Sequence, residues 1–288
     1  MDQLDGFAGA AYQMEGALRL SGPLDTVVAR HESLRTVFMM GKDGHPLQVI
    51  APIHEAVFSV VLEDFPIVDE DDVKERVRII LSEPFDLGAG PLFRARLIAI
   101  AEENHILVVG GHHKVLNGWS VGRFLKEISA LYREAVTGTP AALPELTIQY
   151  ADFAARQRDV LAGDRLAEET EWWRETLPGI PKAITLPFDR PRPKVMDYHG
   201  GSIPVQVPAD VTARLKALAR SKGRAQFVVL EAALSALLSR LGAGEEVVIG
   251  TAMAGRPRPE LENLAGFFVN TVALRNRVDA LAPFREHL

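Results

Sequence analysis

The chain has 288 residues, 47% hydrophobic and 24% charged, so it is long enough to bury a large core in one or two domains. Its 32 basic and 38 acidic residues give a net charge of -6 and form no basic stripe, which argues against a nucleic-acid partner. The absence of cysteine excludes thiolate catalysis and disulfides, and with no run of about 18 apolar residues and no signal-peptide pattern we expect a cytoplasmic protein outside the membrane.

The first part of the chain predicts alternating strands and helices. We expect strands at 13–20 and 35–50, the second as a hairpin that turns at GKDGHP. A helical pattern follows at 70–82. Only AEEN separates the apolar runs at 92–100 and 105–111, and a parallel pair would need a much longer crossover, so these runs predict an antiparallel pair.

Helical spacing begins near Trp119 and stops at Gly138 and Pro140. Further helices are expected at 146–163 and 166–177, before a proline-rich linker, LPGIPKAITLPFDRPRPK. Beyond the linker we expect strands at 202–207, 245–250 and 267–275 and helices at 209–220 and 225–241. The sequence therefore predicts a mixed α and β fold in two domains, residues 1–180 and 181–288.

The stretch GGHHKVLNGWS, residues 110–120, carries two adjacent histidines before an Asn-Gly turn. Successive side chains of a strand point to opposite faces, so His112 and His113 can share a site only if the backbone breaks there. Histidine can accept or steer a proton at neutral pH, and the turn offers N–H groups for an oxyanion. The residues alone leave catalysis, metal binding and packing open.

Two rival interpretations concern the same stretch. GWSVG, residues 118–122, fits the G-x-S-x-G elbow of serine hydrolases, and Asp189 or Asp197 followed by His199 would complete the order of partners. The elbow needs a parallel strand, however, so we interpret Ser120 as a helix N-cap. The other histidines show no HExxH-type spacing with the pair, and we expect no metal site.

Four motifs resemble those of one family. HHKVLNGWS resembles the HHxxxDG signature of the condensation domains of nonribosomal peptide synthetases, which share a fold with chloramphenicol acetyltransferase-like acyltransferases. RHESLRTVF at 30–38 resembles the second family motif, YADF at 150–153 the fourth, and IGTAMAGRPRPELENLAGFFVNTVALR at 249–275 the fifth. The four occur in the family's order across nearly the whole chain.

The resemblance implies two acyltransferase-like lobes in a V shape, bridged by the loop 250–270, with a tunnel between them. Donor and acceptor carrier proteins would deliver thioesters on phosphopantetheine arms, and the acceptor amine would attack the donor carbonyl to form a peptide bond. The domain itself would bind no cofactor or metal. It would act as a monomer beside an adenylation domain, in secondary metabolism such as antibiotic biosynthesis.

The resemblance also assigns residues. His113 would position or deprotonate the amine, Gly118 would offer its N–H to the thioester oxygen, and His112 would be structural. Arg35 and Arg256 match family arginines that hold the lobes and the site geometry.

The sequence departs from the family at several points. Asn117 stands where the signature has aspartate, whose carboxylate is thought to pair with an arginine, here Arg256. A buried guanidinium with a neutral partner can cost about 3 kcal/mol. Met1–Tyr12 resembles only the tail of the first motif, the last two motifs are absent, and the first helix is about three turns shorter than in the family. We therefore expect an incomplete second lobe and impaired activity.

Two alternatives stay open beside the hydrolase. A degenerate condensation-like module would bind a carrier protein without forming a bond. A free-standing acyltransferase would use acyl-coenzyme A without any carrier.

Overall fold

A computed structural model of the chain describes residues 7–15, 20–55, 60–63, 69–101, 104–191, 193–195 and 203–288. It divides into two compact units: unit 1 is Met1–Leu161 with Ala254–Val269, and unit 2 is Ala162–Met253 with Asn270–Leu288. The boundary falls after Leu161 and not at the expected residue 180, because the helix that ends at Val160 packs into unit 1. The segment 254–269 also belongs to unit 1, and not to the second domain as expected.

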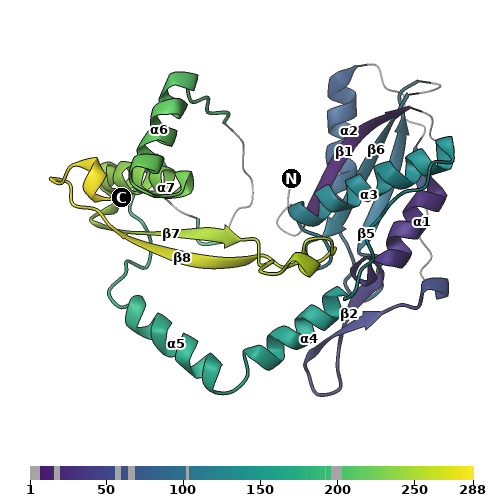
Figure 1. The fold of residues 1–288 in the computed structure, drawn as a ribbon, viewed down its shortest axis with the longest axis horizontal. Coiled ribbons are helices and arrows are strands. Elements are labelled where there is room, and N and C mark those ends of the chain that lie inside the picture. The colour runs from purple at the N-terminus through teal and green to yellow at the C-terminus, as the bar shows by residue number, and fades with distance from the viewer. Residues whose placement is uncertain are drawn as a thin grey trace. The chain divides into compact units, whose positions relative to one another are not determined.

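A four-stranded sheet forms the centre of unit 1 (Figure 1). Its strands lie in the order β1 (Phe7–Glu15), β6 (Asn104–His112), β5 (Phe93–Ala99) and β4 (Val61–Glu63). The predicted antiparallel pairing of β5 with β6 is confirmed. The strand expected at 13–20 ends at Glu15, and residues 16–19 of that prediction lie outside the described part of the chain.

Helices and a hairpin complete unit 1. The predicted helix at 70–82 is confirmed as α2 (Glu70–Ser82), and its capping box at Asp69 explains its start. The predicted hairpin is also confirmed, with β2 (Thr36–Met40) antiparallel to β3 (Pro46–Ile50). The remaining elements are α1 (Ser21–Arg30), a 3-10 turn η1 (Glu32–Arg35), η2 (Ile53–Glu55), α3 (Gly118–Thr137) and α4 (Tyr150–Val160).

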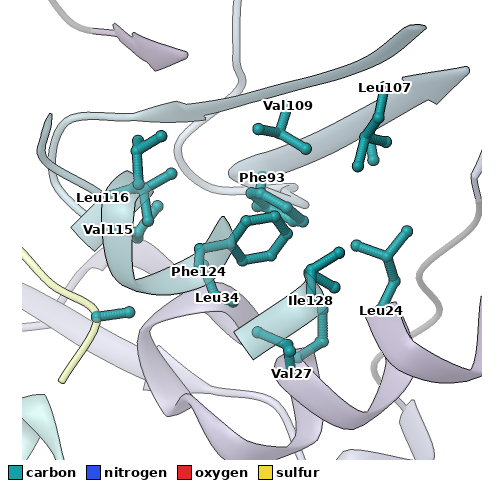
Figure 2. Close-up of a cluster of buried hydrophobic side chains, with 14 of the residues drawn as sticks. Leu24, Val27, Leu34, Phe93, Leu107, Val109, Val115, Leu116, Phe124 and Ile128 are labelled. Carbon is teal, nitrogen blue, oxygen red and sulfur yellow. The ribbon is translucent and has the colours of Figure 1, made fainter. Parts of the chain in front are cut away.

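The main core lies between the sheet and the helices α1 and α3 (Figure 2). Phe93 of β5 meets Phe124 of α3 edge-on, with ring centroids 4.9 Å apart. Leu24 and Val27 of α1 are fully buried in the same cluster. Burial of these apolar side chains fixes the amino end of α3 just after the end of β6.

The segment 254–269, which contains the 3-10 turn η4 (Pro259–Leu261), packs within unit 1 against the region of α4 through a small core of its own. Leu261, Leu264 and Phe268 contact apolar residues in and before α4. Only glycine fits at 266, because a Cβ there would lie 2.3 Å from the Tyr150 ring at a φ of +155°. The strand expected at 267–275 begins only at Asn270.

The described residues of unit 2 form three α-helices and one antiparallel pair of strands. The expected strand at 202–207 is wrong for residues 203–207, which are not paired, because Pro204 removes a donor and the apolar residues around it are exposed. The elements are α5 (Asp164–Thr176), α6 (Ala209–Ser221), α7 (Gln226–Leu238), a π-type turn η3 (Ser239–Ala243), β7 (Glu246–Met253), β8 (Asn270–Arg277) and a 3-10 turn η5 (Phe284–Glu286).

One helical stretch, Gln226–Ala243, is long and apolar enough to cross a membrane by length and composition. The stretch is not an uninterrupted run of apolar residues, since it contains Glu231 and Arg240, but its mean hydropathy still meets the criterion. A single stretch of this kind is weak evidence, since core helices of globular domains satisfy the same criterion.

Candidate active site

The backbone breaks directly after His112, as a shared site for the two histidines requires. His112 ends β6, and its carbonyl accepts hydrogen bonds from the N–H groups of Val115 (2.9 Å) and Leu116 (3.2 Å). The side chains of Val115 and Leu116 are buried in the main core and anchor this turn. His113 therefore lies in a fixed turn between the end of a strand and the start of a helix.

His113 is half-buried, so its ring is neither in the core nor fully in solvent. Its Nδ1 atom is buried and has no hydrogen-bond partner. The ring of Phe267 packs against the imidazole at 64°, with centroids 6.0 Å apart. Because Nδ1 is enclosed, a substrate can reach this imidazole only at Nε2.

His112 has a different environment. Its Nδ1 accepts a hydrogen bond from the Lys114 N–H at 3.2 Å, and its ring lies edge-on to Phe85. Burial, and then the nearby Lys114 and His113 side chains, lower the pKa of His112, which favours the neutral ring. This placement supports a local structural role. No group of three or more metal-ligating side chains occurs among the described residues.

Asn117, and not Ser120, is the N-cap of α3, which corrects the sequence-based interpretation. Its Oδ1 atom accepts hydrogen bonds from the Ser120 N–H (2.9 Å) and the Ser120 hydroxyl (2.8 Å). The Nδ2 atom of this residue, which is 2% exposed, is buried without a partner. The Asn117 side chain accepts no hydrogen bond from the N–H of Gly118, which lies at the positive end of the helix dipole.

Gly118 borders open space. A Cβ at this position would meet no atom within 4 Å, and the backbone is not in a left-handed conformation. Neither packing nor backbone geometry within the described structure therefore requires glycine at 118.

Ser120 cannot serve as a hydrolase nucleophile in this fold. Its side chain is fully buried, and its hydroxyl bonds to Asn117 and Gly266. The preceding strand β6 is antiparallel to both of its neighbours, whereas the elbow follows a parallel strand. Of the partners in that hypothesis, Asp197 and His199 lie outside the described residues.

Arg256 lies in this cluster but does not pair directly with Asn117, which corrects the expected contact. Its Nη2 donates to the Ser120 hydroxyl at 3.1 Å, Nη1 donates to the Leu261 carbonyl, and the guanidinium lies 3.9 Å from the Phe268 ring centroid. The Oδ1 of Asn117 serves as the helix cap, and its amide nitrogen is a donor like the guanidinium, so Ser120 bridges the two.

The charge on Arg256 is poorly compensated. Burial and then the charge of Arg123 lower the pKa of Arg256 to about 10, and the charge of Glu262 opposes this shift. The Nε atoms of Arg256 and Arg123 are both buried without a hydrogen-bond partner.

Arg35 is not brought to this site. It donates to the Ala51 carbonyl and to Glu32, 3.4 Å away, and so holds η1 to the residue after β3. It also borders a cavity of about 220 Å³ whose walls include Leu34, Thr36 and Pro91. Its described contacts therefore stabilise the hairpin region, and the expected role in the site geometry has no contact to support it.

Sequence reasoning missed a buried polar cluster beside the site. His31 Nε2 lies 2.9 Å from Glu127 Oε2, and Arg30 Nε lies 3.3 Å from the same oxygen. The His31 Nδ1 atom accepts the Ala265 N–H at 3.3 Å, so a neutral His31 ring donates from Nε2 to the carboxylate. His31 lies in the RHESLR motif, but nothing in the sequence indicates Glu127 as its partner.

Tyr150, in the YADF motif, also contacts the segment 254–269. Its hydroxyl donates to the Phe267 carbonyl at 2.8 Å. The side chain that packs on His113 is thus held through its backbone by α4.

Comparison with known proteins supports the motif resemblance. A family model for the condensation domain matches residues 12–288. Malpibaldin synthetase of Mortierella alpina is 40% identical over 92% of this chain, and phosphinothricin tripeptide synthetase PhsC of Streptomyces viridochromogenes is 38% identical over 100%. The chain spans only 5% and 27% of the length of these two relatives.

Solved structures give the same result for the fold. The X-domain from teicoplanin biosynthesis matches 98% of this chain with a TM-score of 0.86 and 29% identity, and the chain covers 63% of that structure. The first condensation domain of the calcium-dependent antibiotic synthetase matches 98% of the chain with a TM-score of 0.77 and 20% identity, and the chain covers 65% of it.

Proposed function

The chain belongs to the condensation-domain family, and on that premise we propose that it forms an amide bond between two thioester-bound substrates. Condensation domains of nonribosomal peptide synthetases catalyse this reaction. The observation that carries the proposal is the position of His113, half-buried after β6, with Nδ1 enclosed and the N–H of Gly118 at the start of the next helix.

The reaction balances without a metal or redox group. The amine nitrogen of the acceptor attacks the carbonyl of the donor thioester, the C–N bond forms, the C–S bond breaks, and the amine proton ends on the departing thiolate. His113 Nε2 accepts a hydrogen bond from the amine and orients its lone pair. The Gly118 N–H, aided by the dipole of α3, stabilises the negative charge on the carbonyl oxygen.

The surroundings of His113 favour orientation over complete proton abstraction. In a catalytic triad a carboxylate holds the second nitrogen of the base. Among the described residues no acceptor contacts His113 Nδ1. A hydrogen bond from the amine needs no such partner, and positioning alone can supply a large part of a bimolecular rate enhancement.

The partners follow from the family. Condensation domains of these synthetases work with carrier and adenylation domains. We propose donor and acceptor carrier proteins whose phosphopantetheine arms present the substrates, and a monomeric domain in the cytoplasm.

A single-turnover assay tests the proposal. The chain is mixed with a loaded donor carrier and a loaded acceptor carrier, and the amide product is quantified by mass spectrometry. We expect product from the wild type and none from His113→Ala, while His54→Ala, at an exposed position, should match the wild type. Equal product from His113→Ala would overturn the assignment, and product from acyl-coenzyme A without a donor carrier would indicate the free-standing acyltransferase.

Two observations favour a second candidate, a module that binds a partner without forming a bond. Asn117 replaces the signature aspartate, and the X-domain from teicoplanin biosynthesis, which was also solved in a complex with OxyB, is similar to this chain at 29% identity. Carrier binding in a pull-down assay, with no product in the single-turnover assay, would support this candidate.

A further inference from the structure

The Ser120 hydroxyl lies where four polar groups meet. It lies 2.8 Å from Asn117 Oδ1 and 3.0 Å from the Gly266 carbonyl, and it accepts hydrogen bonds from the Gly266 N–H (3.1 Å) and from Arg256 Nη2 (3.1 Å). A hydroxyl has one proton and two lone pairs. It can therefore donate to one oxygen at a time while accepting from both nitrogens, which ties α3 to the segment 254–269 at a fully buried point.

Gly266 connects the Ser120 hydroxyl to the surroundings of His113. Both backbone polar groups of Gly266 lie within hydrogen-bond distance of the Ser120 hydroxyl, and the next residue, Phe267, packs its ring against the His113 imidazole. The Phe267 carbonyl accepts from the Tyr150 hydroxyl. The backbone of the aromatic residue beside His113 is thus fixed on one side by Ser120 and on the other by Tyr150.

We propose that Ser120 is a positioning residue, whose hydroxyl fixes Gly266 and thereby holds the Phe267 ring against the His113 imidazole. Its effect on the rate rests on the proposed function, but its effect on the position of Phe267 does not. Ser120 touches neither His113 nor Phe267 in the described contacts, so it acts through Gly266.

The neutral Asn117 makes this hydroxyl more important in this chain. An aspartate at 117 would offer a second anionic oxygen, whereas Asn117 offers Oδ1 alone, and that atom caps α3. The hydroxyl of Ser120 is therefore the side-chain acceptor through which Arg256 is connected to α3. Removal of the hydroxyl leaves both Arg256 Nη2 and the Gly266 N–H without this acceptor.

Nuclear magnetic resonance of the full chain tests whether Ser120 holds the Phe267 ring against His113. In protein labelled with ¹³C at histidine, His113→Gln identifies the His113 ring signal, and Phe267→Leu shows how far the signal moves when the aromatic ring is lost. We expect Ser120→Ala to move the signal in the same direction as Phe267→Leu. The control is Ser235→Ala, which removes a buried helix serine in unit 2 and should leave the signal unchanged.

A second variant covers the case in which Ser120→Ala does not fold. Tyr150→Phe removes only the hydroxyl that donates to the Phe267 carbonyl, and we expect it to move the His113 signal by a smaller amount in the same direction. Ser120→Thr keeps the hydroxyl and should restore the wild-type position. An unchanged His113 signal in folded Ser120→Ala, or in Tyr150→Phe if Ser120→Ala does not fold, would overturn the proposal.

The kinetic result follows if the chain forms amides. Misplacement near a reacting group can reduce a rate by about 100-fold. We expect Ser120→Ala to reduce kcat by about 10-fold to 100-fold with little change in KM, Ser120→Thr to recover most of the loss, and Ser235→Ala to match the wild type. A wild type without product would refute the proposed function, while the resonance experiment would still decide the role of Ser120.

Discussion

Two buried polar clusters bond to neighbouring residues of the segment 254–269, and one cluster contains a carboxylate whereas the other does not. The first joins His31, Arg30 and Glu127 and accepts the Ala265 N–H. The second joins Asn117, Ser120 and Arg256 and bonds to both polar groups of Gly266. Only the first contains a negative charge.

The carboxylate balances the cationic charge in the first cluster but has no counterpart in the second. In the first cluster the Glu127 carboxylate faces both the Arg30 guanidinium and the His31 N–H. Both clusters hold a cation and two buried side-chain atoms without a hydrogen-bond partner, Arg30 Nε and Glu127 Oε1 in the first and Asn117 Nδ2 and Arg256 Nε in the second. Because no carboxylate in the second cluster balances the Arg256 charge, we expect the second cluster to be the weaker anchor.

Removing the charge of the first cluster should have the largest effect on stability. In Glu127→Gln the side chain keeps its shape, but Arg30 and His31 lose their anionic partner. Loss of one member of a buried ion pair costs about 3 kcal/mol, so the free energy of unfolding should fall by that amount in urea denaturation. Glu75→Gln changes the same group in an exposed ion pair on α2 and should barely change it. Equal effects of the two variants would contradict the comparison.

Acid should weaken the first cluster selectively. Burial alone would raise the pKa of Glu127, but the hydrogen bond from His31 and the charge of Arg30 outweigh it and lower the pKa. A carboxyl whose pKa is lower in the folded state stabilises the fold above its unfolded pKa of about 4.3, and this stability is lost as the pH falls through the lowered value. The stability difference between wild type and Glu127→Gln should therefore shrink from pH 5 to pH 3. A constant difference would indicate that Glu127 does not titrate in this way.

Adding a carboxylate to the second cluster should make the two clusters alike. In Asn117→Asp the unpartnered Nδ2 becomes an oxygen beside the Ser120 bridge to Arg256, and the N-cap is kept. We expect a gain of about 1 kcal/mol in the free energy of unfolding, seen as a higher Tm. Asn263→Asp also adds a carboxylate, next to Arg123, but removes no unpartnered buried donor, so its gain should be smaller. A lower Tm for Asn117→Asp would show that Arg256 is already compensated.

These clusters also mark what the sequence could and could not predict. Local patterns were sufficient for α2, where a capping box precedes an amphipathic run, and for the β5–β6 pair, where the link is too short for a crossover. They failed at 203–207, where apolar alternation suggested a strand but Pro204 interrupts it. Motif resemblance led to His113 and Asn117 but not to their contacts.

Contacts between distant parts of the chain had no local signal. Glu127 lies 96 residues from His31, and Gly266 lies 146 residues from Ser120. The neighbours of Ser120 in the sequence suggest only a possible nucleophile or a helix cap. Its distant partners, Gly266 and Arg256, lie in the segment 254–269, which the fold places on α3 and α4.

Gly118 should show the smallest effect on stability, although it borders the same N-cap. A Cβ at 118 meets no atom within 4 Å, so Gly118→Ala should change the free energy of unfolding by less than about 0.5 kcal/mol. The new methyl group would instead occupy the open space beside the N–H that we assign to the thioester oxygen, so amide formation should fall at least about 10-fold. Gly122→Ala, one turn further along α3 and equally free of neighbours, is the matched control: it should leave amide formation unchanged and raise the free energy of unfolding by up to about 1 kcal/mol, because alanine favours the helix. If both variants retain full activity, the space beside Gly118 is not used by the substrate, and the oxygen must be stabilised elsewhere.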